Sequence, residues 1–444
     1  MFLVIAASAS ASGYASKEQL PALPETGFSE QTVWALNVGG AHFESRAGEV
    51  FLADDCSQGG APCAQSNQIL RTQNPSLYQS FREGHQRYSR PIPNGIYSVA
   101  LFFNEASEEQ GSDRIFDVLI EGATVLKSFN VYQVAGSATD VAVTRTIADI
   151  EVTDGTIDIE LASPSSNAVL SGFAVRASSF AVGDWQITWS DEFLGPKLDT
   201  EVWTPELWDP AHVNNEDQTY TQEAKNLRLE NGVLVMEAHH EGDRTPKYSS
   251  ARIHSAAQQD LTYGRVDIRA RVPEGQGLWP ALWLFPTDPY RYATKCSAQD
   301  AEVNDNARCD AWPNSGEIDL MEHVGHEPGI VHGTVHTRDY YFKLGNQIGQ
   351  SILLPDLGEE FHTYSLVWGP SALGMYVDSQ RYFTYVNDGE GFGQWPFDHA
   401  FHVILNLAVG GDWGRAGGPV DNSVFPQRLE VDFVRLYKPR TTGM

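Results

Sequence analysis

At 444 residues the chain is too long for one ordinary domain and suits two. Hydrophobic residues make up 41% of it and charged residues 20%, which allows sizeable packed cores and excludes disorder over most of the length. The formal net charge of −28 argues against nucleic acid and anionic membranes as partners, because both would be repelled.

The chain begins with a short apolar run at residues 2–7, followed by alternating serine and alanine at residues 8–12. This pattern resembles the apolar core and the cleavage zone of a secretory signal, although the usual preceding basic residues are missing. The run is too short to span a membrane as a helix. We therefore expect residues 1–15 to be the remnant of a signal peptide, and the protein to be secreted to the outside of the cell or to a periplasm.

The four cysteines form two local pairs, Cys56 with Cys63 and Cys296 with Cys309. In an exported chain such pairs predict disulfides that tie loops together. Four unpaired thiols are the alternative, and a zinc site is disfavoured because no Cys-x-x-Cys spacing is present.

Both halves of the chain read as short strands separated by turn residues, without a long helical period. The clearest strands are residues 96–103, 116–121, 156–161, 234–238, 264–272, 363–368, 375–377 and 429–437. Ten of the eleven tryptophans follow residue 184, and mostly small residues occupy 177–183. We expect an all-β protein with two β-sandwich domains in series, at residues 31–177 and 184–438, which lie close together because their connection is short.

Three carboxylates fall within one six-residue segment: Glu317, Asp319 and Glu322. On a regular strand Glu322 would point away from the other two, because side chains alternate between faces. A β-bulge near Leu320 and Met321 would bring all three to one face, and bulges are frequent beside active sites. A merely solvated strand face is the weaker interpretation, since three acids on one face would repel each other without a function.

Paired carboxyl groups are what the hydrolysis of a glycosidic bond requires. Close spacing predicts the retaining route, in which one carboxylate attacks carbon and the other donates a proton. By position we assign Glu317 as the nucleophile and Glu322 as the general acid and later base. Asp319 would keep Glu322 protonated through its negative charge, or hydrogen-bond and orient Glu317.

Aromatic residues and histidines surround this segment in the sequence. Trp279 and Trp283 share one strand face, where indoles can stack on sugar rings, although core packing of one of them is the alternative. His332 and His336 share a face of a later strand. Zinc is disfavoured because no His-Glu-x-x-His pattern is present, so we expect His336 to hydrogen-bond the acid strand.

With these residues, the second half resembles glycoside hydrolase family 16, and within it the laminarinase-like β-1,3-glucanases. The resemblance covers essentially all of residues 184–438, in the family's order. Besides the acid strand, the matching segments are residues 189–193, 214–221, 250–253, 277–283, 331–337, 406–411 and 431–437.

The resemblance implies a concanavalin-like β-jelly roll with a concave, endo-acting cleft, and the bulged acid strand is the form found in laminarinases rather than in bacterial lichenases. It implies sugar contacts at Asn215, Arg252, Trp279, Trp283, His336 and Trp413. Catalysis needs no cofactor in this family. Many members hold a structural calcium, for which the matching positions are Glu192, the backbone of Gly232, and Asp432; oxygen ligands suit calcium, and ordinary surface acids are the alternative.

One segment departs from the family. Residues 287–314, which contain Cys296 and Cys309, exceed the connection found in ordinary laminarinases. Our hypothesis is that this segment closes one end of the cleft and shapes substrate preference.

The first half resembles malectin through residues 36–40, 77–82, 93–97, 115–118 and 170–173. The resemblance implies a carbohydrate-binding β-sandwich. However, the loop after Phe103 lacks the aromatic sugar contacts of malectin, while Tyr88 remains near a matching place. Carbohydrate binding and a spacer role are therefore both open.

We predict a secreted, monomeric, retaining endo-β-1,3-glucanase whose partner is a neutral β-glucan of the laminarin type. A mixed-linkage β-1,3/1,4-glucanase, an agarase-like galactan hydrolase and a non-catalytic glucan-binding protein are the alternatives. Sulfated substrates are disfavoured because they call for a cationic cleft. A silent binding protein is disfavoured because both Glu317 and Glu322 are present.

Overall fold

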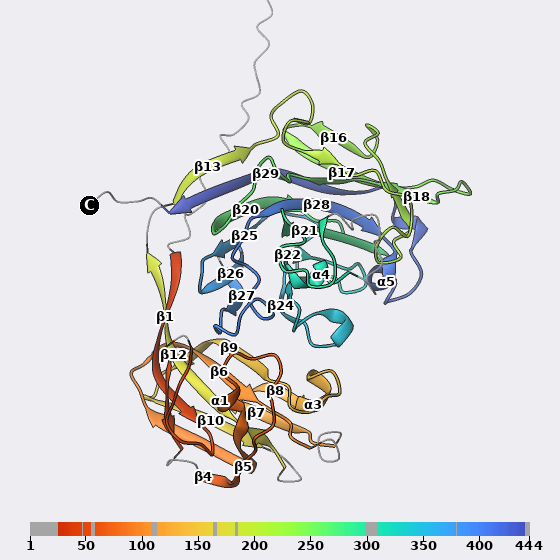
Figure 1. Ribbon diagram of the computed structural model, residues 1–444. Helices are drawn as coiled ribbons and strands as arrows, with labels where there is room; N and C mark the ends of the chain where they lie inside the picture. Colours follow the sequence, from red (N-terminus) through yellow and green to blue (C-terminus); the bar gives the residue numbers. More distant parts are fainter. Residues whose placement is uncertain are drawn as a thin grey trace, which may run out of the picture.

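The computed structural model describes residues 25–46, 48–54, 58–107, 113–162, 167–182, 185–298, 309–378 and 380–439. Over these ranges the chain forms two β-sandwiches in series (Figure 1). The helices in these ranges have only three to five residues each, and none is long and apolar enough to cross a membrane. The expected all-β class is confirmed; residues 1–15 lie outside the described ranges.

The first sandwich packs a six-stranded sheet against a second sheet of similar size. The order of the first sheet is β2-β3-β1-β12-β6-β9, and that of the second is β11-β5-β10-β7-β8, with β4 beside β5. Alternation builds the core between them: along β10, Ile157, Ile159 and Leu161 are buried while their neighbours are partly exposed. The elements are β1 (Glu25–Asn37), β2 (Phe43–Glu44), β3 (Val50–Ala53), β4 (Gln58–Ala64), α1 (Pro75–Gln79), β5 (Ser80–Pro91), β6 (Gly95–Phe103), β7 (Phe116–Ile120), β8 (Ala123–Phe129), α3 (Val131–Val134), β9 (Val143–Val152), β10 (Thr156–Ala162), β11 (Val169–Leu170) and β12 (Gly172–Val182).

The second sandwich packs a seven-stranded sheet against a ten-stranded one. The seven-stranded sheet has the order β14-β19-β28-β21-β22-β23-β24, and the other follows β15-β18-β17-β29-β20-β25-β26-β27, with β13 on β29 and β16 on β17. The elements are β13 (Trp185–Asp191), β14 (Thr204–Pro205), β15 (Gln218–Tyr220), β16 (Leu227–Glu230), β17 (Val233–His240), β18 (Tyr248–Ser250), β19 (Arg252–His254), β20 (Gly264–Arg271), β21 (Leu278–Pro286), α4 (Ala311–Asn314), β22 (Glu317–Glu322), β23 (Ile330–His336), η2 (Phe342–Leu344), β24 (Ile348–Leu353), β25 (His362–Trp368), β26 (Ala372–Val377), β27 (Gln380–Val386), β28 (Phe401–Val409), α5 (Gly411–Gly414), η3 (Asn422–Val424) and β29 (Gln427–Pro439).

Every strand predicted from the alternating pattern is present, with ends that differ by at most three residues. The mostly small residues at the expected domain boundary, 177–183, are strand up to Val182. The reason is pairing: β12 continues alongside β1, with Ala177 opposite Gln31 and Val182 opposite Glu25. This pairing gives the backbone of the connection hydrogen-bond partners.

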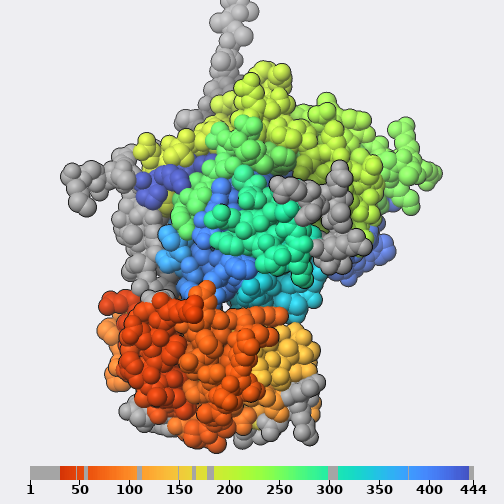
Figure 2. Space-filling view, in the orientation of Figure 1, coloured from red at the N-terminus to blue at the C-terminus, as the bar shows by residue number. Residues whose placement is uncertain are grey.

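The two sandwiches lie directly against each other, as their short connection predicts (Figure 2). The loops after β23 and β27 of the second sandwich hydrogen-bond residues of the first, among them Thr144 and Thr146 of β9. The predicted disulfide between Cys296 and Cys309 is formed. Cys56 lies outside the described residues, and Cys63 has no disulfide partner among them.

Candidate active site

The acid strand β22 contains the β-bulge that the spacing of its carboxylates predicts. Against β21, Met321 lies opposite Leu282 and Asp319 opposite Trp283, so that Leu320 is the extra residue. The register to β23 shifts at the same place. Leu320 and Met321 are both buried in the core, so the bulge returns Glu322 to the face shared by Glu317 and Asp319.

A tyrosine from the opposite sheet supports the bulge. The hydroxyl of Tyr382 on β27 donates a hydrogen bond of 2.6 Å to the carbonyl oxygen of Leu320. Gly333 on β23 leaves room for this side chain, because a Cβ there would lie 2.5 Å from the tyrosine hydroxyl. The bulge removes the buried carbonyl group of Leu320 from the regular pairing of the strands, and Tyr382 gives it a hydrogen-bond donor from the opposite sheet.

Each glutamate of the acid strand accepts a hydrogen bond from a tryptophan. The indole N–H of Trp312 donates to Oε2 of Glu317 over 2.9 Å, and that of Trp279 donates to Oε1 of Glu322 over 3.0 Å. The side chain of Glu317 is 17% exposed. Both carboxyls are therefore largely removed from water, and each accepts from the indole N–H of one tryptophan.

Burial and, after it, the nearby charge of Glu322 raise the pKa of Glu317 to about 7, against the lowering effect of the hydrogen bond from Trp312. Burial likewise raises the pKa of Glu322 to about 7, against the lowering effect of Trp279. Since two neighbouring carboxylates repel each other, the pair loses its two protons in separate steps. Around neutral pH one carboxyl can be ionised while the other holds a proton, which is the state that acid and nucleophilic catalysis require together.

Asp319 is less charged than the sequence suggests. Burial, followed by the charges of Glu317 and Glu322, raises its pKa well above the usual value. Its hydrogen bond with Glu317 lowers the pKa of Glu317. Burial is the main cause of the raised pKa of Glu322, and the expectation that the charge of Asp319 helps to keep Glu322 protonated stays a prediction. The other expectation, that Asp319 hydrogen-bonds Glu317, is confirmed.

His336 faces the acid strand from β23. Its Nε2 lies 3.3 Å from Oδ2 of Asp319 and 3.9 Å from Oε1 of Glu317. Burial lowers the pKa of His336 to about 4, so its ring is neutral at neutral pH. Glu317, Asp319 and His336 are close enough together to bind one metal ion. Acid and nucleophilic catalysis by the carboxyls does not require a metal ion.

Side chains in register with Glu322 form a row across five strands of the sheet. Arg252 pairs with Asn406, Asn406 with Ala281, Ala281 with Glu322, and Glu322 with His332. Directly opposed residues of neighbouring strands share a face. These side chains therefore form a surface that runs across the strands. On it, β19, β28 and β21 lie on one side of the acid strand and β23 lies on the other.

On the β19 side of the acid strand the surface is built from indoles and a guanidinium group. The guanidinium of Arg252 lies 4.3 Å from the ring of Trp208 and 4.9 Å from that of Trp283, and it pairs with Glu206. The indole N–H of Trp283 donates to Oδ1 of Asn406 over 2.7 Å. Trp283 and Trp279 are both half-buried on this face, so neither belongs to the core.

Trp413 on α5 extends the surface beyond Glu322. Its ring stands edge-on to Trp279 at 5.6 Å and lies 5.1 Å from His332. Asn215 donates to Oδ1 of Asp412 over 2.8 Å, next to Trp413 in the chain. All six residues that the sequence assigns to sugar contacts thus lie on this face or at its rim.

On the other side of the acid strand the surface continues as a hollow of about 240 Å³ over β23 and β24. Its lining is polar and consists of His332, Thr334, Gln347, Gly349, Gln350 and Ser351. A chain-like ligand that crosses the strands would meet indoles on one side of the carboxyls and amides and hydroxyls on the other.

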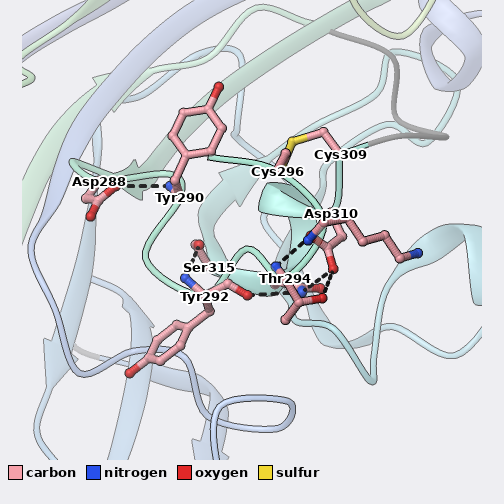
Figure 3. The surroundings of a disulfide bond; sticks show 10 residues. Asp288, Tyr290, Tyr292, Thr294, Cys296, Cys309, Asp310 and Ser315 are labelled. Atoms are coloured by element: carbon pink, nitrogen blue, oxygen red, sulfur yellow. Dashed lines mark hydrogen bonds between the residues drawn. A yellow bond between two sulfur atoms is a disulfide. The ribbon is translucent and has the colours of Figure 1, made fainter. Parts of the chain in front are cut away.

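The long segment between β21 and β22 contributes to the site through Trp312. Near its base the disulfide of Cys296 and Cys309 lies beside Asp310, whose carboxylate accepts from the backbone N–H and the hydroxyl of Thr294 (Figure 3). Sequence reasoning treated this segment as an insertion and missed Trp312. The signal was available, since Trp312 precedes Glu317 by only five residues.

Two of the three residues assigned to calcium, Glu192 and Asp432, have charged partners in this structure. Glu192 forms two hydrogen bonds with Arg435, at 2.8 and 2.9 Å, and Asp432 pairs with Arg269 at 2.8 Å. Gly232 lies in the turn between β16 and β17. The guanidinium groups make this donor set less anionic than the sequence suggests, and calcium binding stays a prediction.

In the first sandwich, Tyr88 cannot serve as a surface contact for sugar. It is 1% exposed, packs against Phe173 at 5.0 Å, and donates from its hydroxyl to Gln86. The interpretation of Tyr88 as a remaining sugar contact is therefore wrong. The start of the loop after Phe103 is likewise held inside, because the buried Glu105 pairs with the buried Arg114 at 2.6 Å.

Comparison with known families matches both halves of the chain. Residues 207–434 match the glycosyl hydrolases family 16, and residues 32–176 match the malectin domain. A β-glucanase of Rhodothermus marinus is 42% identical over 261 residues, which cover 57% of this chain and 85% of that protein.

Solved structures are similar over the same half. The laminarinase from Rhodothermus marinus has 40% sequence identity and a TM-score of 0.52, covering 58% of this chain and 99% of its own. SCLam, a non-specific endo-β-1,3(4)-glucanase, has 35% identity and a TM-score of 0.50, covering 58% of this chain and 92% of its own.

Proposed function

We propose that this chain, which belongs to glycoside hydrolase family 16, cleaves internal β-1,3 bonds of laminarin-type β-glucan by the retaining route. The observation that carries the proposal is the bulged acid strand, which brings Glu317, Asp319 and Glu322 to one face. The raised pKa values of Glu317 and Glu322 support it, because the pair can hold one proton near neutral pH.

In the first step the ionised carboxylate of Glu317 attacks the anomeric carbon, while Glu322 donates its proton to the departing glycosidic oxygen. The bond from the sugar to that oxygen breaks, and an ester forms between the sugar and Glu317. In the second step Glu322, now ionised, takes a proton from water, and the water oxygen displaces Glu317 from the sugar. Both carboxyls return to their starting states, and the anomeric configuration is retained.

The surroundings of Glu317 support its role as the nucleophile. It receives a hydrogen bond from the indole N–H of Trp312 and shares one with Asp319, whose raised pKa keeps a proton available for it. Fixed donors hold a carboxylate in one orientation without reorganisation during the reaction. The neutral His336 lies beside Asp319 and adds no charge that would compete.

We propose that the substrate is a neutral glucan that crosses the strands of the sheet. Indoles and amides suit flat, uncharged sugar rings, and the net charge of −28 disfavours sulfated galactans. Mixed-linkage β-1,3/1,4-glucan is a second candidate, favoured by the similarity to the non-specific glucanase SCLam. The proposed contacts are Asn215, Arg252, Trp279, Trp283, His336 and Trp413.

Three further points belong to the proposal. The protein acts outside the cell or in a periplasm, which suits a polymeric substrate and the Cys296–Cys309 disulfide. It acts as a monomer. Glu192, Asp432 and the backbone of Gly232 would hold a structural calcium, for which both carboxylates would have to leave their arginine partners.

Analysis of the products from laminarin, lichenan and agarose, measured side by side, tests the substrate. We expect short β-1,3-linked oligosaccharides from laminarin, slower cleavage of lichenan and no cleavage of agarose. Cleavage of agarose alone would overturn the glucanase assignment. In a parallel measurement, Glu317→Ser should abolish hydrolysis while oligosaccharide binding remains, and undiminished activity of this variant would reject Glu317 as the nucleophile.

A further inference from the structure

The first sandwich holds the loop that follows β23. Tyr340 in this loop is buried, and its hydroxyl donates to the carbonyl oxygen of Thr144 over 2.8 Å and accepts from the N–H of the same residue over 3.2 Å. The guanidinium of Arg145 lies 4.8 Å above the tyrosine ring. Farther along the loop, the side-chain amide of Asn346 donates to the carbonyl oxygen of Val134 over 3.1 Å. Residues 340–346 are thus fixed at both ends by the first sandwich.

The first sandwich also holds the loop that follows β27. The side chain of Asp388 is 3% exposed there, and it accepts from the hydroxyl of Thr146 over 2.8 Å and from the guanidinium of Arg176 over 3.2 Å. Glu390 accepts from the hydroxyl of Thr72 over 2.8 Å and from the amide of Asn74 over 3.1 Å. Buried carboxylates need such partners, so this loop is tied to one docked arrangement.

Both loops lead to Trp312, the hydrogen-bond donor to Glu317. From the first loop, the rings of Tyr341 and Phe342 lie 5.5 and 5.7 Å from that of Trp312, and Phe342 also lies 6.0 Å from His336. From the second loop, Phe392 reaches the same region through Tyr292.

Phe392 stacks on Tyr292 with ring centroids 4.8 Å apart and planes 3° from parallel. The backbone of Tyr292 is in turn joined to α4, because its carbonyl oxygen accepts from the amide of Asn314 over 3.1 Å. The two loops are also joined to each other, since the N–H of Asp339 donates to the carbonyl oxygen of Gly393 over 3.0 Å. Trp312 on α4 therefore packs between elements that the first sandwich holds in place.

We propose that the first sandwich is a positioning domain for the active site: it fixes the loops after β23 and β27, and through them the indole of Trp312 against Glu317. Loops without such support open locally at little cost in free energy, and a small displacement of a positioning group lowers the rate of reaction strongly. Tyr340 and Thr146 are positioning residues in this arrangement. This role goes beyond the hydrolysis itself, and its kinetic readout rests on the proposed role of Glu317.

Two full-length variants test the proposal, one for each loop. Tyr340→Phe removes the hydroxyl that binds both backbone groups of Thr144, and Thr146→Val replaces the hydroxyl that donates to Asp388 with a methyl group of similar volume. Thr156→Val is the matched control, because Thr156 lies on β10 in the other sheet of the first sandwich, opposite Pro91. The measurements are kcat/KM on laminarin against pH, with thermal melting of each variant to verify folding.

We expect each test variant to lower kcat/KM about two- to thirtyfold, the range that coupling residues outside a site usually produce. The acidic limb of the pH profile should move to higher pH, because Glu317 loses part of the stabilising hydrogen bond from Trp312. The control should match the unmodified protein in both respects. An acidic limb that stays in place in both folded variants would overturn the proposal, whether or not the melting temperature falls, because a purely structural contact changes stability without changing the ionisation of Glu317.

Discussion

Replacing Trp312 with phenylalanine tests how Glu317, the proposed nucleophile, is ionised. The change removes the indole N–H that donates to Oε2 of Glu317 over 2.9 Å and keeps an aromatic ring near His336 and Phe342. That hydrogen bond stabilises the ionised form of Glu317, so its loss raises the pKa of Glu317. The acidic limb of kcat/KM, where Glu317 gains a proton, should therefore move to higher pH.

The size of the shift follows from the strength of the bond. A hydrogen bond to a charged group contributes about 1.5–3 kcal/mol, and Glu317 is only 17% exposed, so solvent screening removes little of this. With about 1.4 kcal/mol for each pKa unit, the limb should move by about one to two units. Below the limb, where the rate follows the ionised fraction, the loss of activity is then about ten- to a hundredfold.

Trp279→Phe is the matched control for this experiment. It removes the N–H that donates to Glu322, so it raises the pKa of the general acid and should move the alkaline limb instead. Both profiles are measured as kcat/KM on laminarin oligosaccharides from pH 4 to pH 10, a range chosen to bracket the raised pKa values. If Trp312→Phe moves the alkaline limb and Trp279→Phe the acidic one, the two glutamates have the opposite roles. A uniform loss of rate without movement of either limb would refute the reasoning.

Three further outcomes are expected. Tyr382→Phe leaves the carbonyl oxygen of Leu320 without its donor and should lower the free energy of unfolding by about 1–3 kcal/mol in urea denaturation, together with kcat; unchanged values of both would mean that the bulge does not need this support. Calcium added to chelator-treated protein at about a hundred times its Kd should stabilise it by about 2.7 kcal/mol and raise Tm, whereas an unchanged Tm would reject the site at Glu192, Gly232 and Asp432. Deletion of residues 297–308, which keeps Trp312, should change the lengths of the products from laminarin, and an identical product profile would show that this part of the segment does not shape the cleft.

The alternation of side chains made the strands and the bulge predictable. Period two is a local property, so the strand at residues 156–161 is found nearly as predicted. The bulge was predictable from six residues, because on a regular strand Glu322 would point away from Glu317 and Asp319. The same alternation indicates that Tyr88 is buried, since Gln86 and Tyr88 lie on the buried face of β5.

What the sequence did not reveal depends on burial and on contacts between distant segments. From the sequence alone Asp319 is expected to be ionised. In the fold it is buried beside two other carboxyls, and its pKa is raised. Tyr382 reaches Leu320 from a strand 62 residues away, and Tyr340 reaches Thr144 across 196 residues. No periodicity within either segment specifies such a pairing. These contacts become visible only when the two sheets and the two sandwiches are in place.

A covalent bond between Glu317 and the sugar defines the proposed retaining route. The most direct measurement is mass spectrometry of the protein after incubation with an activated 2-deoxy-2-fluoro-β-glucoside, since the fluorine slows the second step and lets the intermediate accumulate. We expect one glycosyl group, located on the peptide that contains Glu317, and none on the Glu317→Ser variant. An active enzyme that carries the glycosyl group on another residue, or that releases products of inverted configuration, would show that Glu317 is not the nucleophile of a retaining reaction.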